Sequence, residues 1–284
     1  MIRIIKIYFK TLSVLLPSLA GKQAFSLFQV PMNKKIRDKE LPFFEKARAF
    51  TIPWQLEDIQ AYSMGSEDGP LVFLVHGWES SAASLYAIAD RLAAEGHRVI
   101  AFNLPAHGYS KLKRANLKIC KEAFLQVIDF IKPVEPFSVV SHSFGSAVTT
   151  YALARSEWPV NQLVYLSTPD QLDDVFREFA DFVGLNPPAF QKVLDIGSSL
   201  LGEPVDQVSV SKMGNQVDCR SLTIIHDEKD KIIDKRHAEK VASQWPNSVL
   251  TMIKGTGHYR MLWNEKVLDL VSQQLSQTQE KIAD

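Results

Sequence analysis

Short apolar runs alternate with helical patterns along most of this chain, and that alternation restricts its fold more than any other feature. A run such as Leu71–Val75 is apolar at every position, so both faces of the strand that it forms must be covered. Parallel strands with helices on each side of the sheet provide that cover. The sequence therefore predicts an α/β fold, a mostly parallel central sheet flanked by helices. The predicted strands are Ile59–Met64, Leu71–His76, Arg98–Phe102, Phe137–Ser141, Gln162–Ser167, Ser221–His226 and Ser248–Ile253, and the predicted helices are Ala82–Glu95, Leu117–Ile131 and Ser146–Arg155.

The alternation of strands and helices is interrupted between residues 169 and 217. No convincing strand falls in this stretch, and its apolar residues recur at intervals of three and four positions. We expect a helical cap, inserted before the strand that leads into an acidic loop, over the carboxyl edge of the sheet where open α/β sheets bind ligands. Packing within the cap is favoured over an acyl pocket for Phe176, Phe179 and Phe182.

The predicted organisation has four parts. At 284 residues with 46% hydrophobic content, the chain is long and apolar enough for one sizeable core. An amphipathic helical segment spans residues 1–49, and the α/β core spans residues 50–168 and 218–275. The helical cap fills residues 169–217, and residues 276–284 form a polar tail.

Positive charge gathers at the N-terminal end, although the formal net charge of the whole chain is zero. The zero balance gives no general attraction to nucleic acid, whereas residues 1–40 hold eight Lys or Arg and two acids. The uncharged run Thr11–Gly21 is too short to span a bilayer, and a secretory signal peptide is disfavoured. Lys6, Lys10 and Ser13 lie on one face of a helical pattern whose other face is apolar. Two interpretations stay open: packing on the chain's own domain, or peripheral membrane contact through residues 1–30.

Cysteine content bears on the cellular compartment and on metal binding. Cys120 and Cys219 are the two cysteines of the sequence, and they form no Cys-x-x-Cys pair. Neither a disulfide framework nor a thiolate zinc site is indicated. We therefore expect a cytoplasmic protein, with membrane association through the basic N-terminal segment as the alternative.

The segment Phe137–Ser146 carries the clearest chemical signal in the chain. An apolar run leads into Ser141-His142-Ser143-Phe144-Gly145, and a helical pattern follows. A serine at the apex of such a strand–turn–helix corner has its hydroxyl exposed, and the amides of the new helix face whatever the hydroxyl attacks. Ser143 is therefore a candidate nucleophile.

A serine nucleophile needs a base within hydrogen-bond reach and an acid that orients the base. His258 follows the last predicted strand in a loop with two glycines, which suits the base. The strand before it ends in a loop that offers Asp227 and Asp230. We favour Asp230, because it lies deeper in the loop and just before the apolar pair Ile232-Ile233. Less favoured acids are Asp170, Asp173 and Asp174.

The oxyanion formed during acyl transfer needs two hydrogen-bond donors. Phe144 supplies one backbone N–H, and Trp78 supplies the other, because Leu71–Val75 runs directly into His76-Gly77-Trp78. Gly77 allows the bend that directs the Trp78 amide inward. The predicted substrate pocket is formed by His76, Gly77, Tyr109 and His142.

These segments together resemble the α/β-hydrolase superfamily over roughly residues 56–275. The resemblance is carried by His76-Gly77-Trp78, Asn103-Leu104-Pro105-Ala106-His107-Gly108-Tyr109-Ser110, Ser141-His142-Ser143-Phe144-Gly145, Asp230 and Gly257-His258. It implies Ser143 as nucleophile, His258 as general base and Asp230 as orienting acid, with the amides of Trp78 and Phe144 as the oxyanion hole. The basic amphipathic stretch before the sheet is similar to an uncharacterised bacterial branch of that superfamily.

One position departs from the family pattern. Ser141 stands where the elbow usually has glycine, and we expect a slightly strained turn that still works.

The function expected from this set of residues is that of a serine hydrolase. It would cleave a carboxylic ester with an apolar acyl group through an acyl-enzyme on Ser143, with no cofactor and no metal. The same triad also serves thioesterases, lipases and C–C hydrolases, and a non-catalytic binding protein with this fold is the alternative outside enzymology.

Overall fold

The computed structural model describes residues 2–33 and 35–276. These residues form two compact units: unit 1 holds the chain up to Pro31 together with Gln171–Ser209, and unit 2 holds Met32–Asp170 and the chain from Val210 onward. The polar tail predicted for residues 276–284 lies outside the described residues from position 277. The boundaries predicted at residues 49, 168 and 217 stay predictions of domain organisation.

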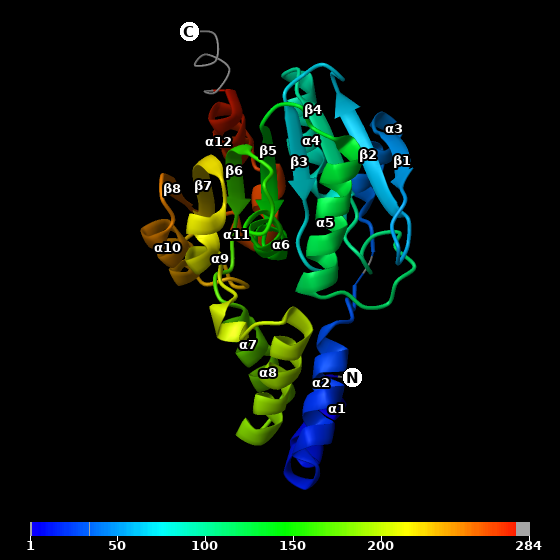
Figure 1. The fold of residues 1–284 in the computed structure, drawn as a ribbon, viewed down its shortest axis with the longest axis vertical. Helices are drawn as coiled ribbons and strands as arrows, with labels where there is room; N and C mark the ends of the chain where they lie inside the picture. Colours follow the sequence, from blue (N-terminus) through cyan, green and yellow to red (C-terminus); the bar gives the residue numbers. More distant parts are fainter. Residues whose placement is uncertain (1, 34, 277–284) are drawn as a thin grey trace. The chain divides into compact units, whose positions relative to one another are not determined.

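Unit 2 is built on one eight-stranded sheet, drawn as arrows in Figure 1. Its strands, in spatial order, are β1 (Arg48–Ile52), β2 (Ile59–Gly65), β4 (Arg98–Phe102), β3 (Leu71–Val75), β5 (Phe137–His142), β6 (Val160–Leu166), β7 (Cys219–Asp227) and β8 (Ser248–Ile253). The pairs β1–β2 and β2–β4 are antiparallel, and every other neighbouring pair is parallel. The predicted mostly parallel sheet is therefore confirmed.

Helices cover both faces of this sheet (Figure 1). In chain order they are α3 (Leu41–Lys46), α4 (Tyr86–Ala94), α5 (Leu117–Ile131), α6 (Phe144–Leu153), α9 (Val210–Met213), α10 (Lys235–Gln244), α11 (Gly257–Arg260) and α12 (Glu265–Ser276).

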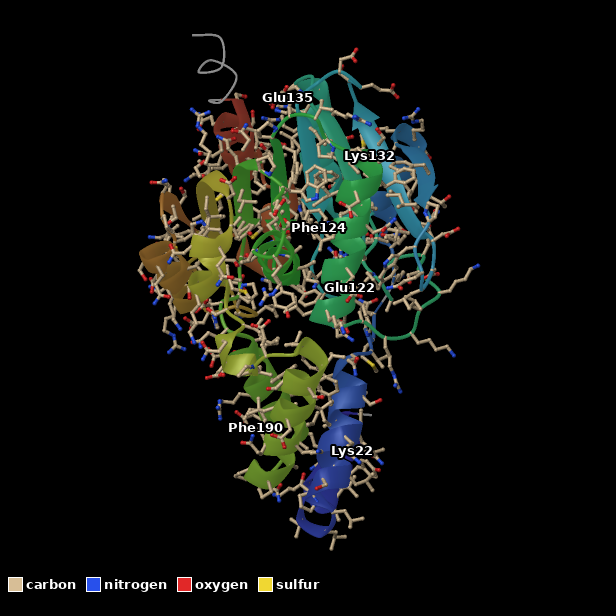
Figure 2. All side chains as sticks on the ribbon, in the orientation of Figure 1. Lys22, Glu122, Phe124, Lys132, Glu135 and Phe190 are labelled. Atoms are coloured by element: carbon tan, nitrogen blue, oxygen red, sulfur yellow. The ribbon has the colours of Figure 1, made fainter. Side chains whose placement is uncertain are left out.

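Successive residues of β3 show why its run is apolar throughout. Leu74 packs into the core that α4 and α12 share with the sheet, and Phe73 lies on the opposite face against Phe124 of α5 (Figure 2). Both side chains are fully buried. An alternating strand would have placed polar groups under one of these helix layers.

The predicted elements of unit 2 recur in the structure with small shifts at their ends. The predicted helix 82–95 begins with a 3-10 turn, Ala82–Leu85, before α4, and the helix after the elbow begins at Phe144 rather than Ser146. Strand β1 was not predicted. It is a short edge strand whose residues are mostly exposed or half-buried, so its sequence lacks the apolar run that marks the central strands.

Unit 1 is helical, and its core joins two distant parts of the sequence. It contains α1 (Ile2–Leu15), α2 (Pro17–Phe28), α7 (Leu172–Val183) and α8 (Pro187–Leu201). The ring of Phe28 lies 4.9 Å from that of Phe176 and 5.2 Å from that of Phe179, centroid to centroid. Two of the three phenylalanines assigned to cap packing thus pack within unit 1, whereas Phe182 is half exposed under the ammonium of Lys6.

Candidate active site

The turn between β5 and α6 places Ser143 in a restricted backbone conformation. Its φ is 52° and its ψ is −124°, a region that non-glycine residues seldom adopt. The turn is held by the Ser143 amide, which donates to the Leu166 carbonyl of β6 at 2.9 Å. A strained serine on a strand-to-helix corner is the geometry that lifts a nucleophilic hydroxyl above the sheet.

Two residues beside the elbow explain why this corner accepts its own sequence. A Cβ on Gly145 would lie 2.4 Å from the Val75 carbonyl oxygen and 2.7 Å from that of His76, so only glycine lets α6 start this close to β3. Ser141 fits because its hydroxyl lies 2.7 Å from the hydroxyl of Thr149 on α6. The serine that replaces the usual glycine thus has a hydrogen-bond partner inside the corner.

Ser143, His258 and Asp230 form a continuous hydrogen-bonded chain. The imidazole Nε2 of His258 lies 3.1 Å from Ser143 Oγ, and its Nδ1 lies 2.7 Å from Asp230 Oδ2. A carboxylate only accepts, so Nδ1 carries the proton and Nε2 is left to accept from the serine hydroxyl. Three side chains that are far apart in sequence therefore form one hydrogen-bonded chain, in the order that a nucleophile, its base and an orienting acid would need.

Asp230 is held as a carboxylate by its surroundings. Burial by itself disfavours its charge, but the hydrogen bond and charge of His258, together with the amides of Ile232 and Ile233, keep the pKa of Asp230 below its usual range. Those two amides donate to Oδ1 at 2.7 and 3.1 Å. Ser167 donates to Oδ2 at 2.8 Å, the same oxygen that accepts from His258.

Sequence reasoning missed Ser167. It follows β6 directly, has a φ of 51° and is fully buried. The available signal was its position, because a polar residue immediately after a parallel strand lies at the same sheet edge as the nucleophile and the acid.

Asp227, the alternative acid, shapes the loop that carries His258. Its Oδ2 accepts from the amide of Thr256 at 2.6 Å and from the Thr256 hydroxyl at 2.9 Å. Burial raises the pKa of Asp227, but these hydrogen bonds and one from the Lys229 amide outweigh burial and lower it overall. Both glycines of that loop, Gly255 and Gly257, have positive φ.

His142 packs against His258 and hydrogen-bonds to its backbone. Its Nε2 donates to the backbone carbonyl of His258 at 2.9 Å, and the two ring centroids are 4.7 Å apart. Burial and the nearby His258 lower the pKa of His142 to about 3. The ring is therefore neutral, and its place in a substrate pocket stays a prediction.

His76 joins two loops with both of its ring nitrogens. Nδ1 donates to the Gly77 carbonyl at 2.7 Å, and Nε2 accepts from the Leu104 amide at 3.0 Å. Burial and the neighbouring His107 lower the pKa of His76 to about 3. The structure thus gives His76 a supporting role for these loops, and its predicted contact with substrate is untested.

The two residues predicted to form the oxyanion hole lie beside each other. The rings of Trp78 and Phe144 are 5.3 Å apart, and a Cβ on Gly77 would lie 3.1 Å from Ser143 Cβ. Phe144 is the first residue of α6, where a backbone N–H has no acceptor within the helix. The arrangement brings both candidate donors to the elbow, and their role with an oxyanion stays a prediction.

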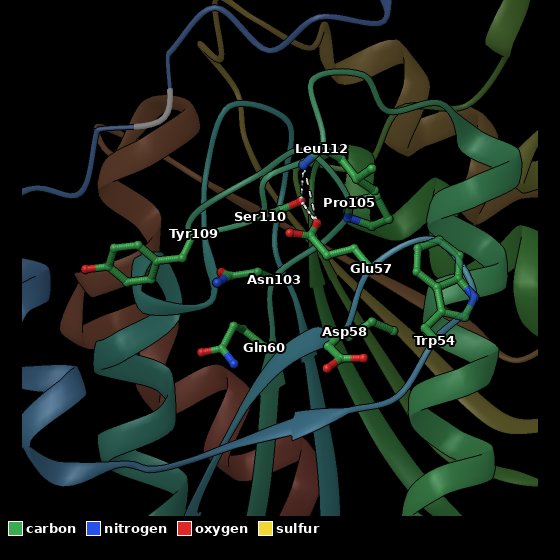
Figure 3. A pocket seen from close by; sticks show the side chains of 10 residues that line it. Trp54, Glu57, Asp58, Gln60, Asn103, Pro105, Tyr109, Ser110 and Leu112 are labelled. Atoms are coloured by element: carbon green, nitrogen blue, oxygen red, sulfur yellow. Dashed lines mark hydrogen bonds between the residues drawn. The ribbon is translucent and has the colours of Figure 1, made fainter.

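Tyr109 lies in a pocket that does not include the triad residues (Figure 3). The pocket is lined by Trp54, Glu57, Asp58, Ile59, Gln60, Asn103, Pro105, Tyr109, Ser110 and Leu112. Glu57 ties its loops together by accepting from the Ser110 hydroxyl and from the amides of Lys111 and Leu112. The ring of Tyr109 lies 5.5 Å from that of Phe44, and its predicted contact with substrate is untested.

The described residues include neither a cluster of metal-binding side chains nor a helix suited to a bilayer crossing. Within residues 2–33 and 35–276, no three His, Cys, Asp or Glu side chains are grouped in a way that could hold a metal ion. Over the same described part of the chain, none of the helices combines the length and the apolar character that a bilayer crossing requires.

Known proteins share both the sequence pattern and the fold. A family model described as alpha/beta hydrolase fold matches residues 70–200. Human serine hydrolase-like protein 2 is 25% identical over 79% of this chain and 68% of its own length. A candidate lipase from Acinetobacter baumannii superposes with a TM-score of 0.66 at 15% identity, over 89% of this chain and 99% of its own. A bacterial membrane phospholipase A superposes with a TM-score of 0.65 at 15% identity, over 84% and 89%.

The fold and the sequence likeness together define the class of the protein. It has the α/β-hydrolase fold, and it has serine hydrolase-like homologues. The resemblance drawn from the sequence is thereby confirmed.

Proposed function

We propose that this chain is a serine hydrolase that cleaves carboxylic esters through an acyl-enzyme on Ser143. The observation that carries the proposal is the hydrogen-bond chain from Ser143 Oγ through His258 to Asp230. The proposed reaction needs no cofactor, because the serine supplies the nucleophile and the imidazole moves the proton.

The proposed reaction has two halves. His258 Nε2 takes the hydroxyl proton as Ser143 Oγ attacks the ester carbonyl, and the amides of Trp78 and Phe144 donate to the oxyanion. The tetrahedral intermediate collapses to the acyl-enzyme while the alcohol leaves with the proton from His258. Water then attacks the acyl carbon with His258 as base, and collapse releases the acid and restores the Ser143 hydroxyl. Asp230 stays ionised and keeps the imidazole in the tautomer that both halves need.

Replacement of Ser143 by alanine tests the assignment. Ser143→Ala should lower kcat/KM on short p-nitrophenyl esters by at least about 10⁴-fold and abolish labelling by a fluorophosphonate probe, since no other group on this path can form the acyl-enzyme. Ser156→Ala is the matched control, because its hydroxyl only donates to the Leu153 carbonyl at the end of α6. It should keep both activities. Labelling that persists in Ser143→Ala would refute the nucleophile.

A substrate panel decides among the other proposed uses of the same triad. Esters, thioesters, lipid esters and C–C bonds next to a carbonyl all pass through an oxyanion at this position. The lipase and phospholipase neighbours share the fold at 15% identity, so the panel rather than the likeness assigns the bond. A folded wild-type protein that neither labels nor turns over any of these substrates would favour a binding protein and contradict the proposal.

A further inference from the structure

Helix α1 has two apolar faces, and only one of them is used in packing. Phe9 and Ser13 are buried in unit 1, where the Ser13 carbonyl accepts from the Asn186 side chain at 2.8 Å. Phe9 belongs to the unit 1 core with Phe25 and Phe176. The sequence pattern had placed Ser13 on the polar face, but packing between the helices of unit 1 buries it.

The second apolar face of α1 is exposed. We call it the apolar stripe, and it consists of Ile4, Ile7, Tyr8, Val14 and Leu15, which are 72%, 62%, 48%, 72% and 70% exposed. At about 100° per residue these positions fall within a sector about 120° wide, opposite the buried face. Leu16 and Leu19, exposed to 54% and 41%, continue the apolar surface into α2. The packing of unit 1 does not account for the exposed large apolar side chains of α1 and α2.

Positive charge runs along one side of the apolar stripe. Arg3, Lys6 and Lys10 are exposed and fall in the sector between the stripe and the buried face. Lys22 adds a further exposed cation on α2 (Figure 2). Residues 2–33 contain no Asp or Glu, because the first acid of the chain is Asp38. The described residues of α1 and α2 therefore present apolar and cationic side chains and no acidic ones.

We infer that the apolar stripe and its basic flank form a docking surface for anionic phospholipid bilayers. A helix lying in the membrane interface buries its apolar face at the headgroup boundary and places Lys and Arg against anionic headgroups. A second copy of the chain fits less well, because an antiparallel isologous contact through the apolar stripe would lay the basic flank of one copy along the basic flank of the other. The docking surface is independent of Ser143 and of the proposed ester cleavage.

Vesicle co-sedimentation of the full chain tests this inference. We expect binding to vesicles of phosphatidylcholine with about 30% phosphatidylglycerol, and at least tenfold weaker binding to phosphatidylcholine alone, since each basic residue near an anionic surface adds attraction. Raising the salt from about 0.1 M to about 0.5 M should weaken the binding severalfold by screening. Equal binding to both kinds of vesicle, or none to the anionic vesicles, would overturn the inference.

Two variants separate the apolar and the ionic contributions. Val14→Ser/Leu15→Ser shortens the stripe at exposed positions, and Arg3→Gln/Lys10→Gln removes charge while leaving Lys6, whose ammonium lies over the Phe182 ring. Each should weaken binding to anionic vesicles at least tenfold. The matched controls are Val134→Ser, at a residue 96% exposed in unit 2, and Lys113→Gln/Lys118→Gln, and both should bind like wild type.

Two further measurements complete the test. Circular dichroism and hydrolysis of a water-soluble ester should be unchanged in the stripe variants, so loss of vesicle binding is distinct from misfolding and from failure of the proposed activity. Sedimentation velocity reports self-association. A dimer of the wild type that Val14→Ser/Leu15→Ser dissolves, without any vesicle binding, would assign the stripe to a second copy and overturn the inference.

Discussion

At the residue scale, the candidate triad depends on the neighbours that hold the Asp230 carboxylate in place. His258 Nδ1–H donates to the Asp230 carboxylate. The same carboxylate also accepts from Ser167, Ile232 and Ile233. Asp230 is thereby kept ionised and fixed in orientation while its buried position excludes water, which is what an orienting acid requires. Ser167 acts through Asp230, so it is a positioning residue.

Removal of the Ser167 hydroxyl should slow the reaction without changing substrate binding. Ser167→Ala should lower kcat by about tenfold or more and leave KM unchanged, because a hydrogen bond to a charged group is worth about 1.5–3 kcal/mol. Steady-state kinetics on a p-nitrophenyl ester measures the split. Ser167→Gly is the matched variant, since glycine suits the positive φ at this position. If glycine restored kcat, backbone strain rather than the hydroxyl would be the cause.

At the element scale, the corner that carries Ser143 is held by close contacts of α6 with β3 and β5. Strand β3 lies beneath the first turn of α6, and Gly145 is the point of closest approach. The partner of Ser141 is Thr149, two turns into the same helix. These contacts hold the elbow, and with it Ser143, in one conformation.

Opposite outcomes are predicted for two small substitutions in this corner. Gly145→Ala should displace Ser143, because its methyl group cannot fit 2.4 Å from the Val75 carbonyl oxygen, and kcat/KM should fall by about 10²-fold. Ser141→Gly should keep kcat/KM near the wild-type value, since it restores the residue usual in the family. Its loss of the Thr149 contact should lower the free energy of unfolding by about 1–2 kcal/mol. Activity and urea unfolding measured on both variants check this contrast, and full activity in Gly145→Ala would contradict it.

At the scale of the whole molecule, buried neutral histidines tie stability to pH. His76 and His142 both have a pKa lowered to about 3 from 6.5, with burial as the largest cause. The unfolded chain therefore binds more protons than the folded protein between these pH values. By linkage the free energy of unfolding rises with pH across that window. The contribution of the two neutral rings to stability is lost as the pH falls from 6.5 toward 3. The lowered pKa of Asp230 adds in the same direction below its unfolded value of 3.8.

Urea unfolding between about pH 4 and about pH 6.5 measures this dependence. Each histidine contributes a slope of up to about 1.4 kcal/mol per pH unit. His142→Gln keeps a donor at the position of Nε2 but cannot titrate, so its slope should be smaller by up to that amount. A free energy of unfolding that does not change with pH in the wild type over this window would contradict the lowered pKa of both rings.

Local sequence patterns predict the central strands, the mostly parallel sheet and the three residues, Ser143, His258 and Asp230, that form the hydrogen-bonded chain. These could be predicted because each depends on local chemistry: an unbroken apolar run needs two covered faces, a serine between a strand and a helix is raised at a corner, and a loop after a strand end presents its polar residue at the sheet edge. The position of Asp230 deep in its loop favours it over Asp227 as the acid. Asp230 is the residue that accepts the hydrogen bond from His258.

The groups that surround the triad residues and the packing of the N-terminal helices depend on contacts between distant parts of the chain. Ser167 and Asp230 are 63 positions apart, so their contact has no local pattern, and β1 is an edge strand whose residues are marked by pairing with β2 rather than by composition. Likewise the sequence pattern of α1 shows one apolar face, and packing with α2 and α7 buries only part of its apolar residues. Local periodicity records that a residue can be buried, whereas the choice of partner is made by non-local contacts that the chain forms on folding.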